Sequence, residues 1–210
     1  MKAEASNYFR SLQEDICNAL SKIDGGSFSV DRWQRQEGDS HGGGGVSRVL
    51  NGDVFEKGGV NFSEVAGELD EDMSFKLVGT RARKPFYATG VSLVIHPRSP
   101  LVPTVHFNLR YLEVDSFCWF GGGTDLTPYY LFQEDARHFH KTLKFGCDKH
   151  NPEYYSKLKR WCDDYFYLAH RAEARGIGGI FFDYLGKDDP QNIRSYFDFS
   201  RSIGDLFLTC

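Results

Sequence analysis

The sequence lacks the features of a membrane-spanning, secreted or disulfide-stabilised protein. No apolar run is long enough to cross a membrane, and the mixed-charge N-terminus has no apolar core of the signal-peptide type. The five cysteines are odd in number, scattered and without a C-x-x-C pair, so neither a disulfide framework nor a zinc site is expected. These absences predict a protein of a reducing, cytoplasmic setting with no stable membrane insertion.

The charge balance argues against nucleic acid as a partner. The formal net charge is −4 at pH 7, which is not the basic character typical of nucleic-acid-binding proteins. No repeat or low-complexity run divides the 210 residues, a length typical of one domain with a proper core. Abundant phenylalanine and tyrosine indicate an ordered globular protein. Because the net charge is negative, an acidic ligand would have to be held by basic residues placed locally.

The densest chemistry lies between Gly90 and Pro128. Two segments, Gly90 to His96 and Thr104 to Glu113, are rich in β-branched and aromatic residues and predict strands joined by a hairpin loop. Side chains of a strand alternate between its faces, so one face is apolar. If His96 lies opposite Thr104, the other face gathers four polar side chains: Ser92, His106, Asn108 and Arg110.

This polar face has two interpretations. A hydroxyl, an imidazole, an amide and a guanidinium suit an anionic substrate, whereas many antiparallel sheets are simply solvated on one side. Downstream, Gly121 to Gly123 separate an aromatic pair from Asp125, which predicts a flexible loop that allows close backbone approach. No Lys-Ser/Thr pair follows, so a phosphate-binding P-loop is excluded. Asp125 is better suited to accepting hydrogen bonds from N–H groups.

End signals and apolar spacing predict the elements of the first half. A helix begins at Ser6 or Asn7 and stops at Gly25. Gly38 to Gly45 is predicted to be a loop, either a mobile lid or an ordinary connection, before a hairpin that turns at Asn51-Gly52. Two further segments follow: a separate strand from Val60 to Val65 and a charged surface excursion from Glu68 to Lys84.

The second half is predicted to be mainly helical. An apolar stripe on the helix after Pro128 includes His140, which is expected to be a core histidine. The next helix begins at Asn151-Pro152 and runs to Gly176, so that Arg175 lies in its last turn and complements the helix dipole. Two elements then follow: the strand Ile180 to Leu185, whose apolar run Asp183 interrupts, and a helix from Asp189-Pro190.

Four segments carry a family resemblance: VIHPRSPLVPTVHFNLRY, WFGGGTDLTP, WCDDYFYLAHR and RGIGGIFFDYL. They resemble the oxygen-dependent coproporphyrinogen III oxidases of haem biosynthesis. The resemblance implies conversion of two propionate groups of coproporphyrinogen III to vinyl groups, giving protoporphyrinogen IX, with molecular oxygen as co-substrate and no organic cofactor. It also implies an α+β fold, a large antiparallel β-sheet flanked by helices on both faces, and a homodimer at full length.

The resemblance assigns roles to individual residues. Three are implied to be catalytic, with His106 as an acid/base group, Asp125 beneath the pyrrole nitrogens and Arg110. The implied substrate-binding set is Ser92, Asn108, Leu109, Arg110 and Arg175. Four histidines match metal ligands of some bacterial relatives, although other members are metal-free, and we expect no functional metal at His96, His106, His140 and His170.

A porphyrin-binding or scaffold protein of the same fold without turnover is the alternative, although the intact set of His106, Arg110, Asp125 and Arg175 favours catalysis. The resemblance also implies that residues 1–210 are a single oxidase domain lacking the family's C-terminal portion. Such a form is expected to have little activity and to associate abnormally through an open sheet edge.

Overall fold

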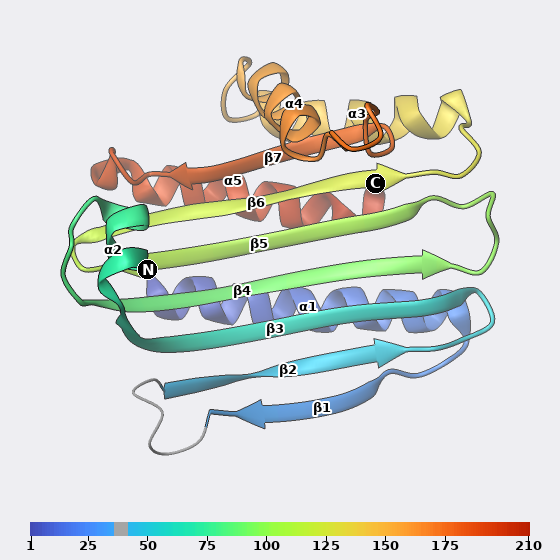
Figure 1. The fold of residues 1–210 in the computed structure, drawn as a ribbon. Coiled ribbons are helices and arrows are strands. Elements are labelled where there is room, and N and C mark those ends of the chain that lie inside the picture. The colour runs from blue at the N-terminus through green and yellow to red at the C-terminus, as the bar shows by residue number, and fades with distance from the viewer. Residues whose placement is uncertain (36–41) are drawn as a thin grey trace.

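The computed structural model describes residues 1–35 and 42–210, which form an α+β fold around one antiparallel sheet (Figure 1). The strands follow one another in chain order across the sheet, so each is paired with its neighbours in sequence. They are β1 (Ser29–Gln34), β2 (Gly42–Leu50), β3 (Phe55–Leu69), β4 (Lys84–Pro97), β5 (Thr104–Val114), β6 (Phe117–Thr127) and β7 (Gly178–Leu185).

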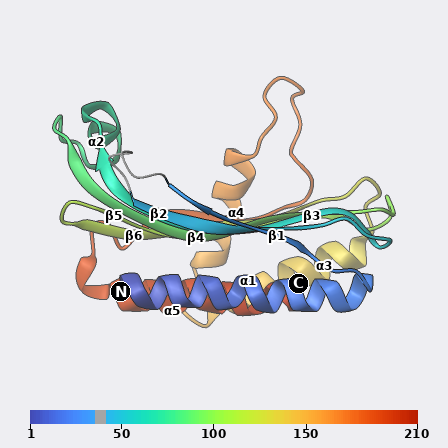
Figure 2. The same ribbon diagram turned by 90° about the horizontal axis from the view of Figure 1, so that it is seen from below.

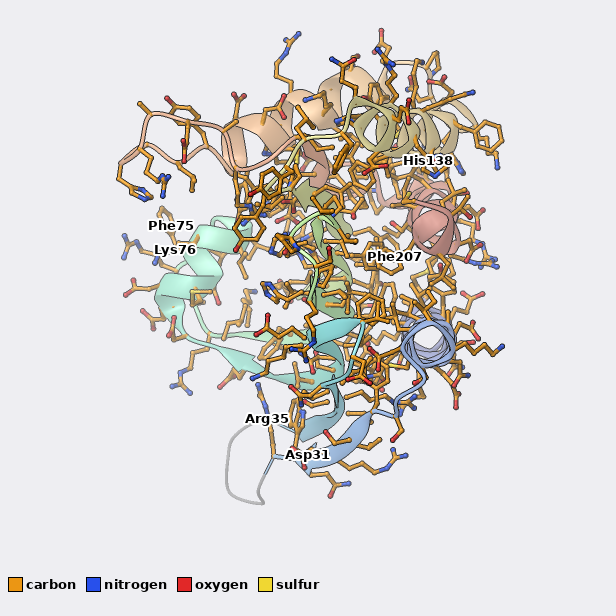
Figure 3. All side chains as sticks on the ribbon, turned by 90° about the vertical axis from the view of Figure 1, so that its right-hand side faces the viewer. Asp31, Arg35, Phe75, Lys76, His138 and Phe207 are labelled. Atoms are coloured by element: carbon orange, nitrogen blue, oxygen red, sulfur yellow. The ribbon has the colours of Figure 1, made fainter. Side chains whose placement is uncertain are left out.

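The helices lie on both sides of this sheet, as predicted. One face is covered by α1 (Lys2–Asp24), α3 (Gln133–Asp148) and α5 (Ile193–Leu206), and we call the opposite face the open face (Figure 2). Short helix α2 (Glu71–Val78) stands on the open side, and Figure 3 shows its Phe75 across the sheet from Phe207. Two 3-10 turns, η1 (Pro190–Asn192) and η2 (Phe207–Thr209), flank α5. None of the described helices is long and apolar enough to cross a membrane.

Helix α4 (Tyr154–Tyr165) runs past the edge strand β7 and connects the two sides. Near its start, Tyr154 packs edge-on against Phe199 of α5, with ring centroids 4.9 Å apart. At its end, Tyr165 stacks on Phe181 of β7 at 4.2 Å. These aromatic contacts hold α4 against both α5 and β7.

The predicted alternation and register of the central strands are confirmed. Ser92 pairs with Asn108, and Val94 pairs with His106. The apolar side chains of β4 and β5 pack against α1 and α5 in the core. Burial of one complete face fixes the register, because a slip of one residue would expose that whole apolar set.

The predicted start of the first helix is wrong. Helix α1 begins at Lys2, and Ser6 is a buried residue inside it whose hydroxyl donates a hydrogen bond of 2.7 Å to Glu64. Packing of Met1 against the core and burial of Ala5 and Ser6 support the helix further toward the N-terminus than the capping signal indicated. The predicted end is confirmed, since Gly25 is the C-cap with a φ of 79°.

Three predictions between Gly38 and Lys84 need correction. Gly42–Gly45 belong to β2 rather than to a loop, and the rest of that predicted loop lies outside the described residues. The Asn51-Gly52 hairpin is confirmed, but the strand after it continues through Val60 to Val65 as one long strand, β3, because it pairs with β2 and β4 along its length. The charged segment contains α2, whose N-cap Asp70 accepts a hydrogen bond of 2.8 Å from the Met73 N–H.

The other main error concerns the end of α4. The helix stops at Tyr165 instead of Gly176, and residues 166–177 form a protruding loop closed by a bridge between Leu168 and Glu173 (Figure 2). Arg175 therefore lies in this loop and not in a helical turn. Its contacts with Asp125 and the Phe166 ring stabilise the loop in place of further helical turns.

Candidate active site

The polar residues predicted to share a face do so on the open face. Strand pairing aligns His106 with Asp125 on β6, Asn108 with Gly123, and Arg110 with Gly121. The triplet Gly121 to Gly123 is thus part of a strand with partners on both sides, not the predicted loop. Its place in the sheet puts Asp125 directly beside His106.

Asp125 is the centre of the site and is only 2% exposed. Nη2 of Arg175 donates to both of its carboxylate oxygens, at 2.9 and 2.8 Å. Nδ1 of His106 lies 3.5 Å from Asp125 Oδ2. A buried carboxylate is costly unless it is paired, and the guanidinium supplies that pairing.

Two nitrogen atoms beside Asp125 are buried and have no hydrogen-bond partner among the described residues. They are Nδ1 of His106 and Nε of Arg175. The guanidinium of Arg175 also lies over the ring of Phe166, with Cζ 3.7 Å from the ring centroid. Because unpaired buried polar groups are unfavourable, these nitrogens are suited to meeting a polar ligand that enters from the open face.

Arg110 lies two alternations beyond His106 along β5, and its side chain is held from two sides. Its Nη1 donates to Asn108 Oδ1 at 3.1 Å, and its Nη2 donates to Asp183 Oδ2 of β7 at 2.8 Å. The side chain is 35% exposed, so a ligand on the open face can reach it. Asp183 interrupted an otherwise apolar run in the sequence, and this was the one signal of its position.

Glycines make the floor of the site flat. Above Gly59 there is open space, since a Cβ there would meet nothing within 4 Å. At Gly123 a Cβ would lie 2.5 Å from the carbonyl oxygen of Ile180, which shows how closely β6 and β7 approach. The absence of a side chain at these two positions gives a broad ligand room to approach the backbone there.

A cavity of about 290 Å³ opens over this floor. Its polar lining includes Asn61, a β3 residue that the sequence analysis did not select and that pairs with Ser92. The sequence predicted strands at the positions of β3 and β4, but it did not reveal the register that pairs Asn61 with Ser92. The lining on the open face comprises Gly59, Asn61, Ser92, Val94, His106, Asn108, Gly123, Asp125, Phe166 and Arg175.

The side chain of Leu109 does not reach this cavity. It points to the helix-covered face, where it is 0% exposed and part of the core. The side-chain alternation that brings Asn108 and Arg110 to the open face turns Leu109 away from it.

The four histidines considered as metal ligands from the sequence do not come together in the described residues. His96 and His106 are on β4 and β5, His140 is on α3, and His170 is in the loop after α4. Within residues 1–35 and 42–210, no three His, Cys, Asp or Glu side chains are grouped to hold a metal ion.

His140 has the environment of a core histidine. Its ring is half-buried, and Nε2 lies 3.1 Å from the carbonyl oxygen of Ile177. Desolvation by burial lowers the pKa of His140, and the neutral ring can then donate its Nε2–H to that carbonyl.

Comparisons with known proteins show which family the sequence resembles. The family described as "Coproporphyrinogen III oxidase" matches residues 4–210. The chain is 52% identical over 207 residues to "Oxygen-dependent coproporphyrinogen-III oxidase, mitochondrial" of Homo sapiens, covering 92% of this chain and 45% of that protein. It is 53% identical over 178 residues to "Oxygen-dependent coproporphyrinogen-III oxidase" of Prochlorococcus marinus, covering 82% and 49%. The chain spans about half the length of the curated relatives it matches.

Proposed function

The chain belongs to the coproporphyrinogen III oxidase family, and from this premise we propose that the protein oxidatively decarboxylates two propionate groups of coproporphyrinogen III to vinyl groups. The product is protoporphyrinogen IX. The observation that carries the proposal is the buried Asp125 between His106 and Arg175, on a glycine floor that is open to a broad ligand.

Each decarboxylation removes two electrons from the substrate. One propionate and one proton react with one molecule of oxygen to give one vinyl group, one carbon dioxide and one hydrogen peroxide. The electron-rich macrocycle can pass electrons directly to oxygen, so we propose that no organic cofactor is needed. The protein then has to bind the substrate, orient it and move protons.

We assign the central acceptor to Asp125. An ionised carboxylate can accept several N–H bonds, as the four pyrrole groups of the substrate require, and can stabilise positive charge that develops in the ring. Arg175 donates a hydrogen bond to each of the two carboxylate oxygens. The substrate has to share Asp125 with this guanidinium or displace it, and a displaced Arg175 becomes free to bind a propionate.

We assign proton transfer to His106 and propionate binding to Arg110, Ser92 and Asn108. Imidazole exchanges protons near neutral pH, and Nδ1 of His106 faces Asp125 at 3.5 Å. The fork of Arg110 can bind a carboxylate through two N–H groups, which fixes orientation as well as charge. Ser92 and Asn108 pair across β4 and β5 and add neutral hydrogen-bonding groups beside Arg110.

A homodimer and a cytoplasmic location are also parts of this proposal. The family resemblance supports the dimer, which sedimentation of the purified protein would test. The location needs a direct test in cells, because the relatives from Homo sapiens and Rattus norvegicus are named mitochondrial.

The direct experiment is incubation of the purified protein with coproporphyrinogen III in air. We expect oxygen uptake and, after oxidation of the products, fluorescence and chromatography of protoporphyrin. The same reaction without oxygen is the control. If coproporphyrin binds but no oxygen is consumed, the alternative of a porphyrin-binding or scaffold protein is favoured instead.

A further inference from the structure

The ion pair between Arg110 and Asp183 spans three strands of the sheet. Arg110 is on β5 and Asp183 is on β7, and the guanidinium crosses the intervening strand β6 to reach the carboxylate at 2.8 Å. The side chains of both residues are partly buried on the open face. This pair lies beside the cavity around Asp125 but outside its lining.

Gly121 makes the crossing possible. A Cβ at this position would lie 2.6 Å from Asp183 Oδ1 and 2.7 Å from Arg110 Nε, so a side chain would occupy the space of the ion pair. The neighbouring glycine differs in kind, because a Cβ at Gly122 would lie 2.6 Å from the carbonyl oxygen of Asn108. Gly121 is therefore the glycine whose absent side chain serves the Arg110 contact rather than the packing of the strands.

Asp183 is itself fixed by the backbone. Its Oδ1 accepts a hydrogen bond of 2.9 Å from the N–H of Tyr184, a residue with a φ of 56°. The left-handed region is unfavourable for a tyrosine, and such strain persists where the surroundings demand it. The backbone at this end of β7 thus restricts the position of the Asp183 carboxylate, so the carboxylate can hold another side chain in place.

We propose that Asp183 is a positioning residue that holds Arg110 ready for a substrate carboxylate. The inference rests on the proposed function, because it assigns Asp183 to the propionate-binding part of that site. Asn108 and Asp183 each take one N–H of Arg110, and these two contacts hold the fork between β5 and β7. Because the Arg110 side chain is already ordered by these contacts, its remaining N–H groups can bind a propionate with little further loss of conformational entropy.

The alternative role is that the Asp183 carboxylate competes with the substrate carboxylate for Arg110. The two roles predict opposite changes in affinity when the charge of Asp183 is removed. Asp183→Asn retains an oxygen for the Tyr184 N–H but removes the charge that holds Arg110. Positioning predicts weaker binding of coproporphyrin III, the stable oxidised form with four carboxylates, by about fivefold, in the range of a partly exposed ion pair. Competition predicts tighter binding, and that result would overturn the proposal.

The experiment is a double-mutant cycle on coproporphyrin III affinity, measured by porphyrin fluorescence without oxygen turnover. The four proteins are the wild type, Asp183→Asn, Arg110→Ala and the double variant. We expect Asp183→Asn to weaken binding in the wild type and to have no further effect once Arg110 is absent. An equal effect in both backgrounds would mean that Asp183 acts independently of Arg110.

Two further variants separate the effect on the Arg110–Asp183 pair from a general effect of the substitution. Gly121→Ala displaces the pair while keeping both charges, and it is expected to weaken binding at least as much as Asp183→Asn. Asp148→Asn removes the acid of the Lys144–Asp148 pair on α3 and should leave affinity unchanged. If the wild type binds coproporphyrin III without turnover, the proposed reaction fails while the cycle still decides the role of Asp183. If the wild type does not bind it at all, the inference fails together with the proposed function.

Discussion

Asp125 is the residue on which the proposed chemistry depends most directly. Asp125→Asn is nearly isosteric, so the sheet should keep its structure, but the amide cannot offer two charged acceptors to the pyrrole N–H groups. We expect kcat/KM to fall by about tenfold or more, because stabilisation of developing positive charge is lost. Steady-state oxygen uptake measures the effect, and unfolding curves show whether the variant is folded.

A matched control separates this effect from a general loss of charge. Glu153→Gln removes the acid of an exposed pair with Lys157 on α4, at the same net-charge change. Its kinetics should match the wild type, since exposed pairs contribute little. A folded Asp125→Asn variant with unchanged kcat/KM would end the assignment of Asp125.

His140 permits a prediction about stability and pH. Burial lowers the pKa of this histidine, so on acidification the unfolded chain takes up the proton before the folded protein does. The free energy of unfolding should therefore fall as the pH drops below about 6.5, the ordinary histidine value. Its Nδ1 has no hydrogen-bond partner among the described residues, and the attraction of the Asp163 carboxylate, which favours protonation, is smaller than the effect of burial.

The test compares urea unfolding of the wild type with that of His140→Gln at pH 7 and pH 5.5. Glutamine can still donate to the Ile177 carbonyl but does not titrate, so its loss of stability on acidification should be smaller. His150 shows a similar lowering of its pKa by desolvation and remains in both proteins. Equal losses in the two proteins would contradict the role given to His140.

At the scale of elements, two glycines of the open face differ in the space available for a side chain: Gly123 is closely packed against β7, and Gly59 is not packed. Gly123→Ala would push a Cβ to 2.5 Å from the Ile180 carbonyl oxygen, so β6 and β7 would have to separate. We expect this to lower the free energy of unfolding by about 1–3 kcal/mol, the usual cost of overpacking. Gly59→Ala meets nothing within 4 Å, and its stability should stay within about 0.5 kcal/mol of the wild type.

The two variants should also differ in kinetics. Gly59→Ala adds a methyl group to the cavity floor and should raise KM while leaving unfolding nearly unchanged. Gly123→Ala should affect stability first. Thermal unfolding and initial rates on the same preparations measure both effects, and a strongly destabilised Gly59→Ala variant would contradict the open space above β3.

The elements show why part of the site followed from the sequence and part did not. Alternation along β5 placed His106, Asn108 and Arg110 on one face, because a strand has a strict period of two. In contrast, the glycine triplet of β6 has a low intrinsic strand preference, and pairing on both sides decides its conformation. Arg175 was correctly selected as a site residue, but it was predicted in the last turn of a helix and lies in the loop after α4. Its contacts with Asp125 and Phe166 are tertiary, so helix-end signals in the sequence do not reveal them.

For the whole molecule, the predicted family and the fold class are confirmed, and the physical reason lies in the order of the strands. Because each strand pairs with its sequence neighbours, local hairpin signals such as Asn51-Gly52 carry over into the complete sheet. Asn61 and Asp183 were missed because they join the site through strands whose register the sequence does not reveal. Their contributions depend on the assembled sheet rather than on any one segment.

The last prediction concerns the reaction as a whole and its need for metal. Among the described parts of the chain, His96, His106, His140 and His170 lie on separate elements and form no metal-binding group. In the proposed reaction the macrocycle itself supplies the electrons, so we expect dialysis against a strong chelator to leave oxygen consumption unchanged. The control is the same preparation supplemented with manganese after dialysis, which should show no gain. Loss of activity on chelation that manganese or another divalent ion specifically restores would instead assign a catalytic metal and require the histidines to come together when substrate binds.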